Sequence, residues 1–138
     1  MKPVSASTSE PMHFVIVEDD FHSAEAMRLL LERQGHRVDL CLDASDAVDF
    51  IRVKRPDVAL LDIMMPGIDG IEIGRRIHSV PGLEDLKSVV ITGKPYDVDR
   101  QRAFAAGSCG FILKPFDPRY FVEDVVACAT TGALPEAV

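Results

Sequence analysis

The sequence predicts an α/β fold in which helices cover both faces of a parallel sheet. Five short apolar runs lack the strict polar and apolar alternation of a half-buried strand, which suits strands buried on both faces. Segments with the apolar spacing of amphipathic helices separate these runs. Five such alternations within about 120 residues imply a doubly wound sheet with five helices, because parallel strands need a crossover between them.

The expected strands are rich in leucine and β-branched residues. They are Phe14 to Val17, Val38 to Leu42, Val58 to Leu61, Ser88 to Ile91 and Gly110 to Leu113. For a five-stranded doubly wound sheet we expect the strand order 2-1-3-4-5, which places the first strand between the second and the third.

The first expected helix is marked by its ends and by an apolar stripe. Asp20 is expected to cap its beginning, and Gly35 is expected to cap its end. Between them, Met27, Leu30 and Leu31 fall on one helical face. This segment therefore connects the first two strands as a helix.

The later helices carry similar signals. The second has apolar residues at positions i, i+3, i+4 and i+7, namely Ala44, Ala47, Val48 and Ile51. Asp69 with Glu72 predicts a capping box at the start of the third. Asp117 followed by Pro118 predicts the start of the last helix, which we expect to run roughly from Pro118 to Thr130.

Length and composition restrict the class of protein. The 138 residues suit one domain, with an expected disordered extension over 1–11, the folded domain over 12–131 and a tail over 132–138. The net charge is −7, and no run of Lys or Arg exceeds two residues, so direct nucleic-acid binding is not expected.

No apolar run approaches the roughly 18 residues of a membrane span. Three cysteines without C-x-x-C spacing indicate buried free thiols, and we expect a cytoplasmic protein.

Carboxylates follow two of the expected strands. Glu18, Asp19 and Asp20 follow the first, and Asp62 closes the third. In the order 2-1-3-4-5 these two strands are neighbours, and their carboxyl ends meet where the strand order reverses, which is where such sheets bind ligands. Clustered carboxylates repel one another unless a cation binds, and oxygen ligands of this kind suit Mg²⁺.

Two further strand ends add a hydroxyl and an ammonium group. Thr92 follows the fourth apolar run, and Lys114 follows the fifth. A phosphoryl group carries negative charge on several oxygens, which need a metal, a cation and a hydrogen-bond donor around them. An aspartate can accept such a group covalently. The set therefore predicts phosphoryl chemistry at a carboxylate.

Each of these residues also has a simpler interpretation. Asp62 alone suits a turn before Met-Met-Pro-Gly, and the acidic residues after the first strand suit helix capping. Thr92 and Lys114 are ordinary residues for strand ends and loops. Their occurrence together, at neighbouring strand ends, favours one shared site.

Four motifs in order resemble the receiver domains of bacterial two-component response regulators, over residues from about Phe14 to Ala129. They are VEDD from residue 17, LDIMMPGIDG from residue 61, ITG from residue 91, and the pair AG at 106 leading to FILKPF at 111. Each motif is weak alone, but together they are highly specific. The resemblance implies a flavodoxin-like, CheY-like fold.

The resemblance also implies roles for individual residues. Asp62 would accept a phosphoryl group from a phosphohistidine on a sensor histidine kinase or a histidine phosphotransfer protein. Glu18 and Asp19 would hold Mg²⁺, together with Asp62 and the backbone carbonyl of Met64. Lys114 would pair with the phosphoryl group, and the peptide bond that follows it would be cis.

A second set of roles concerns the response to phosphorylation. Thr92 would hydrogen-bond the phosphoryl group and swing inward, and Phe111 would follow as the switch aromatic. The rearranged face would consist of the fourth helix, fifth strand and fifth helix. It would act on a downstream protein, on an output domain of a larger regulator, or on a second copy in a homodimer through the fourth and fifth helices.

Some positions depart from the common pattern of the family. Gly93 stands where alanine is usual, which loosens the backbone beside Thr92. Met64 and Lys94 occupy positions that tune phosphoryl lifetime, and an apolar Met64 cannot orient water, so slow self-hydrolysis is expected. Phe111 lacks the hydroxyl of the tyrosine found in many members.

The favoured function is a phosphorylation switch that catalyses its own phosphorylation and slow dephosphorylation, rather than an enzyme acting on other substrates. One alternative is an interaction module that works without phosphorylation. Another is a Mg²⁺-dependent phosphatase with an aspartyl phosphate intermediate. Such hydrolases usually carry a second acid two residues after the nucleophile, where this chain has Met64.

Overall fold

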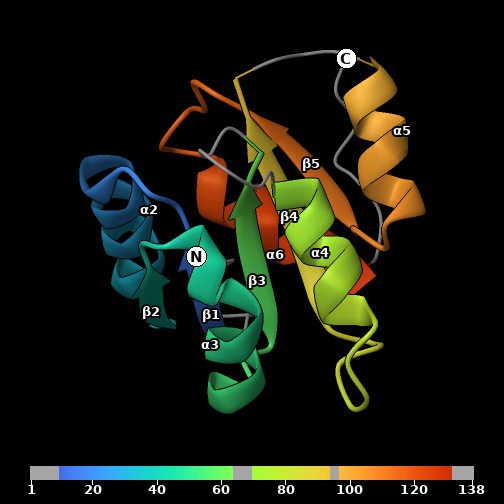
Figure 1. Cartoon of the computed structure of the whole chain (residues 1–138). Coiled ribbons are helices and arrows are strands. Elements are labelled where there is room, and N and C mark those ends of the chain that lie inside the picture. Colours follow the sequence, from blue (N-terminus) through green and yellow to red (C-terminus); the bar gives the residue numbers. More distant parts are fainter. Residues whose placement is uncertain (1–9, 64–69, 94–96, 132–138) are drawn as a thin grey trace.

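A five-stranded parallel sheet lies between two layers of helices (Figure 1). The computed structural model describes residues 10–63, 70–93 and 97–131. The strand order is β2-β1-β3-β4-β5, and every neighbouring pair is parallel. The predicted order 2-1-3-4-5 is therefore confirmed.

Each strand agrees with its predicted range to within one residue at either end. The strands are β1 (His13–Val17), β2 (Arg37–Cys41), β3 (Val58–Asp62), β4 (Lys87–Thr92) and β5 (Gly110–Leu113). The helices within the described ranges are α2 (Phe21–Arg33), α3 (Ala47–Lys54), α4 (Gly70–His78), α5 (Asp97–Ala105) and α6 (Phe121–Thr131). A short 3-10 turn, η1 (Ala44–Asp46), leads into α3.

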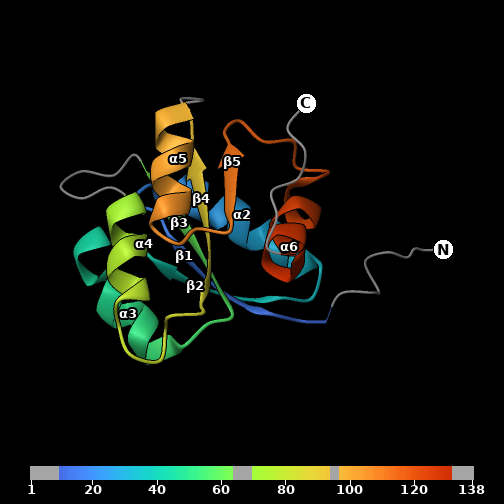
Figure 2. The same cartoon turned by 90° about the vertical axis from the view of Figure 1, so that its right-hand side faces the viewer.

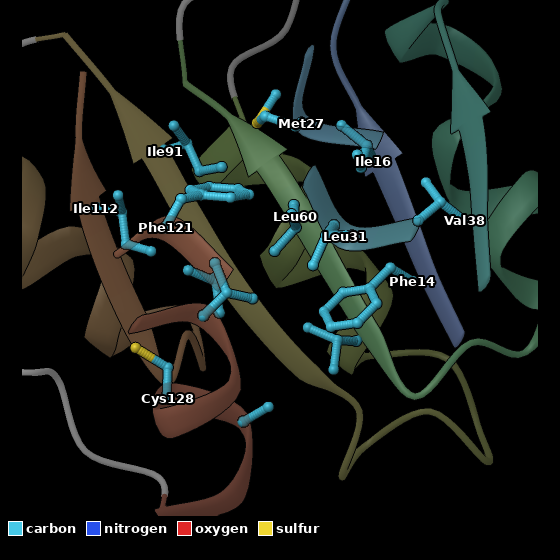
Figure 3. Close-up of a cluster of buried hydrophobic side chains, with 14 of the residues drawn as sticks. Phe14, Ile16, Met27, Leu31, Val38, Leu60, Ile91, Ile112, Phe121 and Cys128 are labelled. Atoms are coloured by element: carbon cyan, nitrogen blue, oxygen red, sulfur yellow. The ribbon is translucent and has the colours of Figure 1, made fainter. Parts of the chain in front are cut away.

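Apolar clusters bury both faces of the sheet. Figure 2 shows α3, α4 and α5 on one side of the sheet, and α2 and α6 on the other. The cluster under α2 and α6 includes Phe14, Ile16, Leu60, Met27 and Phe121 (Figure 3). The cluster under α3 and α4 includes Val15, Val17, Leu61, Ile51 and Ile73. Because successive strand residues are buried on opposite faces, the strands read as unbroken apolar runs.

The ends of α2 largely follow the sequence prediction. The Asp20 side chain caps the helix by accepting a hydrogen bond from the His22 N–H at 3.2 Å. Gln34 rather than Gly35 is the C-cap, and Gly35 follows it with φ +92. A glycine just after the cap relieves the strain of this left-handed conformation, so the predicted signal was displaced by one residue.

The beginning of the last helix was predicted three residues too early. The Asp117 side chain accepts a hydrogen bond from the Arg119 N–H, and the Asp117 carbonyl accepts one from the Tyr120 N–H at 3.0 Å. These bonds hold residues 118–120 in a turn, so α6 starts at Phe121. The predicted cap at Asp69 lies outside the described residues.

Two other expectations can be compared with the fold. Cys41 and Cys128 are buried free thiols as expected, whereas Cys109, in the turn before β5, is only half-buried. Among the described residues no helix is both long and apolar enough to cross a membrane.

Arg55 gives a prediction about stability. It ends α3 with φ 50 and ψ 60, a left-handed conformation that costs a residue with a Cβ about 1–2 kcal/mol. Arg55→Gly removes this strain. The glycine loses more conformational entropy on folding, which costs about 0.5–1 kcal/mol, so we expect the free energy of unfolding to rise by up to about 1 kcal/mol. Gly35→Ala introduces the same strain at φ +92 and is expected to cost about 1 kcal/mol. Urea denaturation measures both changes, and an Arg55→Gly protein less stable than wild type would contradict the account.

Candidate functional site

The carboxyl ends of β1 and β3 bring three carboxylates together. Val17 pairs with Leu61 in the register of these adjacent strands, so Glu18 and Asp62 emerge side by side. Glu18, Asp19 and Asp62 each offer a carboxylate oxygen, and these oxygens lie within 4.8 Å of one another. The topological switch point of the sheet therefore carries an acidic cluster, where the sequence predicted it.

Two of these carboxylates are buried and share a lysine. Glu18 is 2% exposed and Asp62 is 5% exposed, whereas Asp19 faces solvent. The Lys114 ammonium donates to Glu18 Oε1 at 2.9 Å and to Asp62 Oδ2 at 3.2 Å. Buried charges need partners of opposite sign, and one ammonium can neutralise only one of the two carboxylates. The cluster therefore keeps an excess of negative charge that a cation would relieve.

This excess charge is visible in the protonation of the site. Burial raises the pKa of Glu18 to about 7, and the hydrogen bond and negative charge of Asp62 act in the same direction. Lys114 and the Asp20 N–H, which donates to Glu18 Oε2 at 3.2 Å, offset part of that rise. For Lys114, burial works to lower the pKa, but the hydrogen bond to Glu18 and the charge of Asp62 outweigh it and raise the pKa.

The ends of β4 and β5 supply the predicted hydroxyl and ammonium. Thr92 is the last residue of β4 and is fully buried. The Lys114 N–H donates to the Thr92 carbonyl at 2.7 Å, which joins the two strand ends. The Lys114–Pro115 peptide bond is cis, as the resemblance implies. Phe111 lies in β5 and is 5% exposed.

Two residues given roles by the resemblance, Met64 and Lys94, lie outside the described part of the chain.

Beside Lys114, a mostly apolar pocket of about 500 Å³ is lined by Ser23, Ala26, Met27, Gly93, Pro115 and Phe116. The acidic cluster therefore sits next to a hollow surface between α2 and the segment after β5.

Gly70 is a site residue that the sequence analysis did not identify. It begins α4, and a Cβ on Gly70 would lie 2.4 Å from the carbonyl oxygen of Asp62. The missing side chain lets α4 approach the backbone of Asp62 closely. The glycine of the IDG motif was visible in the sequence, but its contact with Asp62 depends on the three-dimensional approach of α4.

A sheet of order 2-1-3-4-5 with an acidic cluster and a lysine at its switch point defines a class of signalling domain. Residues 14–126 match the family model described as "Response regulator receiver domain". The chain belongs to this family, and it is a phosphorylation switch rather than an enzyme of the usual kind. Its acidic cluster is typical of the Mg²⁺ site of receiver domains.

Similarity to known sequences and structures supports this family assignment. The transcriptional regulatory protein AfsQ1 of Streptomyces coelicolor is 35% identical over 105 residues, which cover 76% of this chain and 45% of AfsQ1. A LuxR-family response regulator from an Aurantimonas species has a TM-score of 0.83 and 28% identity, covering 93% of this chain and 91% of that one. The BeF3-activated receiver domain of Klebsiella pneumoniae RstA has a TM-score of 0.76 and 25% identity, covering 86% and 98%. The chain spans about half the length of the curated relatives it matches.

The raised pKa of Glu18 predicts a pH-dependent stability. An ordinary glutamate titrates at 4.5, and Glu18 in the folded protein titrates at about 7, so between these values the folded state holds the proton more tightly. Without a metal ion, the free energy of unfolding should therefore fall as pH rises through this window, by at most about 3 kcal/mol from this group. Thermal denaturation in EDTA near pH 5 and near pH 8 measures the change.

Glu18→Gln is the matched control for this prediction, because it cannot ionise. Subtracting its pH dependence from that of the wild type isolates Glu18 from the other carboxylates. Mg²⁺ added near pH 8 should raise the melting temperature of the wild type more than that of Glu18→Gln, since ligand binding to the folded state stabilises it. Identical pH profiles for the two proteins would show that Glu18 does not carry this effect.

Proposed function

We propose that this receiver domain accepts a phosphoryl group on Asp62 in a Mg²⁺-dependent reaction. The observation that carries the proposal is the position of Asp62, whose carboxylate closes β3 beside Glu18 and Asp19 and within hydrogen-bonding distance of Lys114. A carboxylate so placed has a cationic partner for an incoming phosphoryl group and neighbouring acids for a metal ion.

The donor set fits Mg²⁺. Three carboxylates in one cluster offer hard oxygen ligands, and the exposed position of Asp19 leaves room for the waters that Mg²⁺ usually retains. When bound, the ion neutralises negative charge on the carboxylates and on the incoming phosphoryl oxygens. The ligand expected from the backbone of Met64 stays a prediction.

The transfer itself needs little from the protein beyond position and charge. A carboxylate oxygen of Asp62 attacks the phosphorus of a phosphohistidine, the P–N bond breaks, and its electron pair returns to the imidazole nitrogen. Lys114 then leaves Asp62 and pairs with a phosphoryl oxygen. Thr92, at the neighbouring strand end, donates its hydroxyl to another. Water attack on phosphorus later releases phosphate. We expect this hydrolysis to be slow, because the apolar side chain of Met64 cannot orient water.

The donor is a sensor histidine kinase or a histidine phosphotransfer protein, since receiver domains pair with histidine kinases. Response to phosphorylation passes through the face of α5, β5 and α6, the fourth and fifth helices of the family pattern with the strand between them. In support, exposed apolar side chains lie on or next to these elements, namely Val98, Phe104, Leu113 and Tyr120. Exposed apolar groups favour contact with another protein.

The partner on this face is a downstream protein, an output domain of a larger regulator, or a second copy of the chain. Relatives such as AfsQ1 are named transcriptional regulatory proteins, and each is about twice as long as the part that matches. Direct nucleic-acid binding by this acidic chain is not proposed. The cytoplasmic location and the tuning of lifetime by Lys94 stay predictions from the sequence.

Incubation with Mg²⁺ and acetyl phosphate, followed by intact mass over time, tests the proposal. The wild type should gain one phosphoryl group, EDTA should prevent the gain, and removal of the donor should be followed by slow loss. No gain in Mg²⁺ from acetyl phosphate or from a phosphorylated histidine kinase would contradict it. Rapid, repeated release of phosphate from the donor would instead favour the phosphatase alternative.

A further inference from the structure

Among the described residues, helix α5 buries little apolar side-chain surface. It lies beside α4 on one face of the sheet (Figures 1 and 2). Ala103 is fully buried, whereas Val98 and Phe104 are 59% and 40% exposed. A helix with so little buried apolar surface opens more easily than the core helices. Any additional contact that attaches α5 therefore has a large influence on its position.

Arg100 makes such a contact. Its guanidinium carbon lies 5.0 Å from the centroid of the Phe111 ring, within the range of a cation–π interaction. Arg100 is half-buried and Phe111 is 5% exposed, so the guanidinium covers a ring that is otherwise packed inside. The contact joins α5 to β5 directly.

The ring of Phe111 in turn belongs to a small cluster that reaches the phosphorylation site. The other buried members are Ile63, Ile71, Val90 and Ala103. Ile63 follows Asp62 in the chain, and its N–H donates to the Ile91 carbonyl at 3.1 Å. Val90 pairs with Phe111 in the register of β4 and β5. The Phe111 ring is therefore linked through buried apolar contacts to Ile63, the residue next to Asp62.

We propose that Arg100 is a positioning residue that keeps α5 docked by holding the Phe111 ring in its buried position. The part of this inference that concerns signalling rests on the proposed function: α5 then responds to events at Asp62 through the ring that Arg100 covers. Because the contact is partly exposed, its removal should raise the opening equilibrium of α5 by about two- to five-fold.

Hydrogen exchange of the α5 amides measures this opening even when the docked state predominates, because the exchange rate scales with the opening equilibrium. Arg100→Gln should speed exchange in α5 about two- to five-fold and leave the amides of β1 and β3 unchanged. Arg100→Lys keeps a cation and should restore part of the protection. Arg102→Gln is the matched control, since Arg102 lies on the same helix and pairs with Asp99 at 3.2 Å.

A further variant shows whether Arg100 acts through the ring. In a Phe111→Leu background, Arg100→Gln should no longer change the exchange of α5, because the aromatic partner is gone. Equal acceleration with and without the ring, or no acceleration in the single variant, would overturn the inference.

A separate measurement compares hydrogen exchange of α5 in the wild type with and without beryllofluoride and Mg²⁺. A change in α5 exchange supports the coupling to Asp62. No change there, together with a positive Arg100 result, would count against the proposed function while supporting the role of Arg100 in docking the helix.

Discussion

Asp62→Asn is expected to abolish phosphorylation by acetyl phosphate while leaving the domain no less stable than the wild type. The amide cannot attack phosphorus as a carboxylate does, and the other acids of the cluster do not replace it. Glu18 is the more deeply buried neighbour, and both of its carboxylate oxygens accept hydrogen bonds, one from Lys114 and one from the Asp20 N–H. Asp19 is the exposed member of the cluster.

The stability part of this prediction follows from the charge at the site. Asp62 raises the pKa of Glu18 through a hydrogen bond and through its negative charge. Replacing it with a neutral amide leaves Lys114 to pair with Glu18 alone, at 2.9 Å. The apo protein near pH 8 should therefore unfold at the same temperature as the wild type or a higher one.

Intact mass and thermal denaturation test the two parts together. Asp49→Asn is the matched control, because Asp49 is an exposed aspartate that pairs with Arg52 on α3. It should be phosphorylated like the wild type. Full phosphoryl incorporation by Asp62→Asn would exclude Asp62 as the acceptor, and an unfolded Asp62→Asn would show that the charge balance described here is wrong.

Gly70→Ala is expected to destabilise the domain and to disturb phosphorylation, although the residue carries no functional group. The added Cβ would lie 2.4 Å from the carbonyl oxygen of Asp62 and 2.8 Å from its carbonyl carbon. Both are backbone atoms, so no side-chain rotation relieves the overlap. Overpacking of this kind typically costs about 1–3 kcal/mol. Since α4 or the end of β3 must shift, we also expect phosphorylation to slow about tenfold or more.

Gly93→Ala provides the matched control at the opposite side of the site. Gly93 follows Thr92, and apart from its chain neighbours no atom of the described residues lies within 4 Å of a Cβ added to it. Its effect on stability should stay below about 1 kcal/mol. Urea denaturation and the initial rate of mass gain compare the two variants. A Gly70→Ala protein that behaves like Gly93→Ala would show that α4 does not need this close approach.

The general layout of the site was predictable because topology alone produces it. Apolar runs buried on both faces identify the strands, and the order of strands in a doubly wound sheet makes β1 and β3 neighbours. Glu18 and Asp62 then emerge together without any knowledge of side-chain conformation. The same reasoning placed Thr92 and Lys114 at the neighbouring strand ends.

Contacts that depend on how elements approach one another were not predictable. Nothing in the sequence shows that Lys114 bridges both buried carboxylates, that Gly70 touches the Asp62 backbone, or that Arg100 covers Phe111. The start of α6 was missed for a local reason, since Asp117 was expected to cap a helix and instead closes a turn with Arg119. In each case the outcome depended on how neighbouring elements and turns pack, which the sequence does not show.

Chemical trapping of the modified residue identifies the position of the phosphoryl group, which we expect to be Asp62. Borohydride reduces an acyl phosphate of aspartate to homoserine, which marks the modified position in a wild-type protein without any substitution. After incubation with Mg²⁺ and acetyl phosphate, peptide mass mapping should find homoserine at Asp62 and aspartate at Asp19 and Asp20. Homoserine at either of those residues, or a phosphoryl group on a serine, threonine or histidine with Asp62 unmodified, would contradict the account.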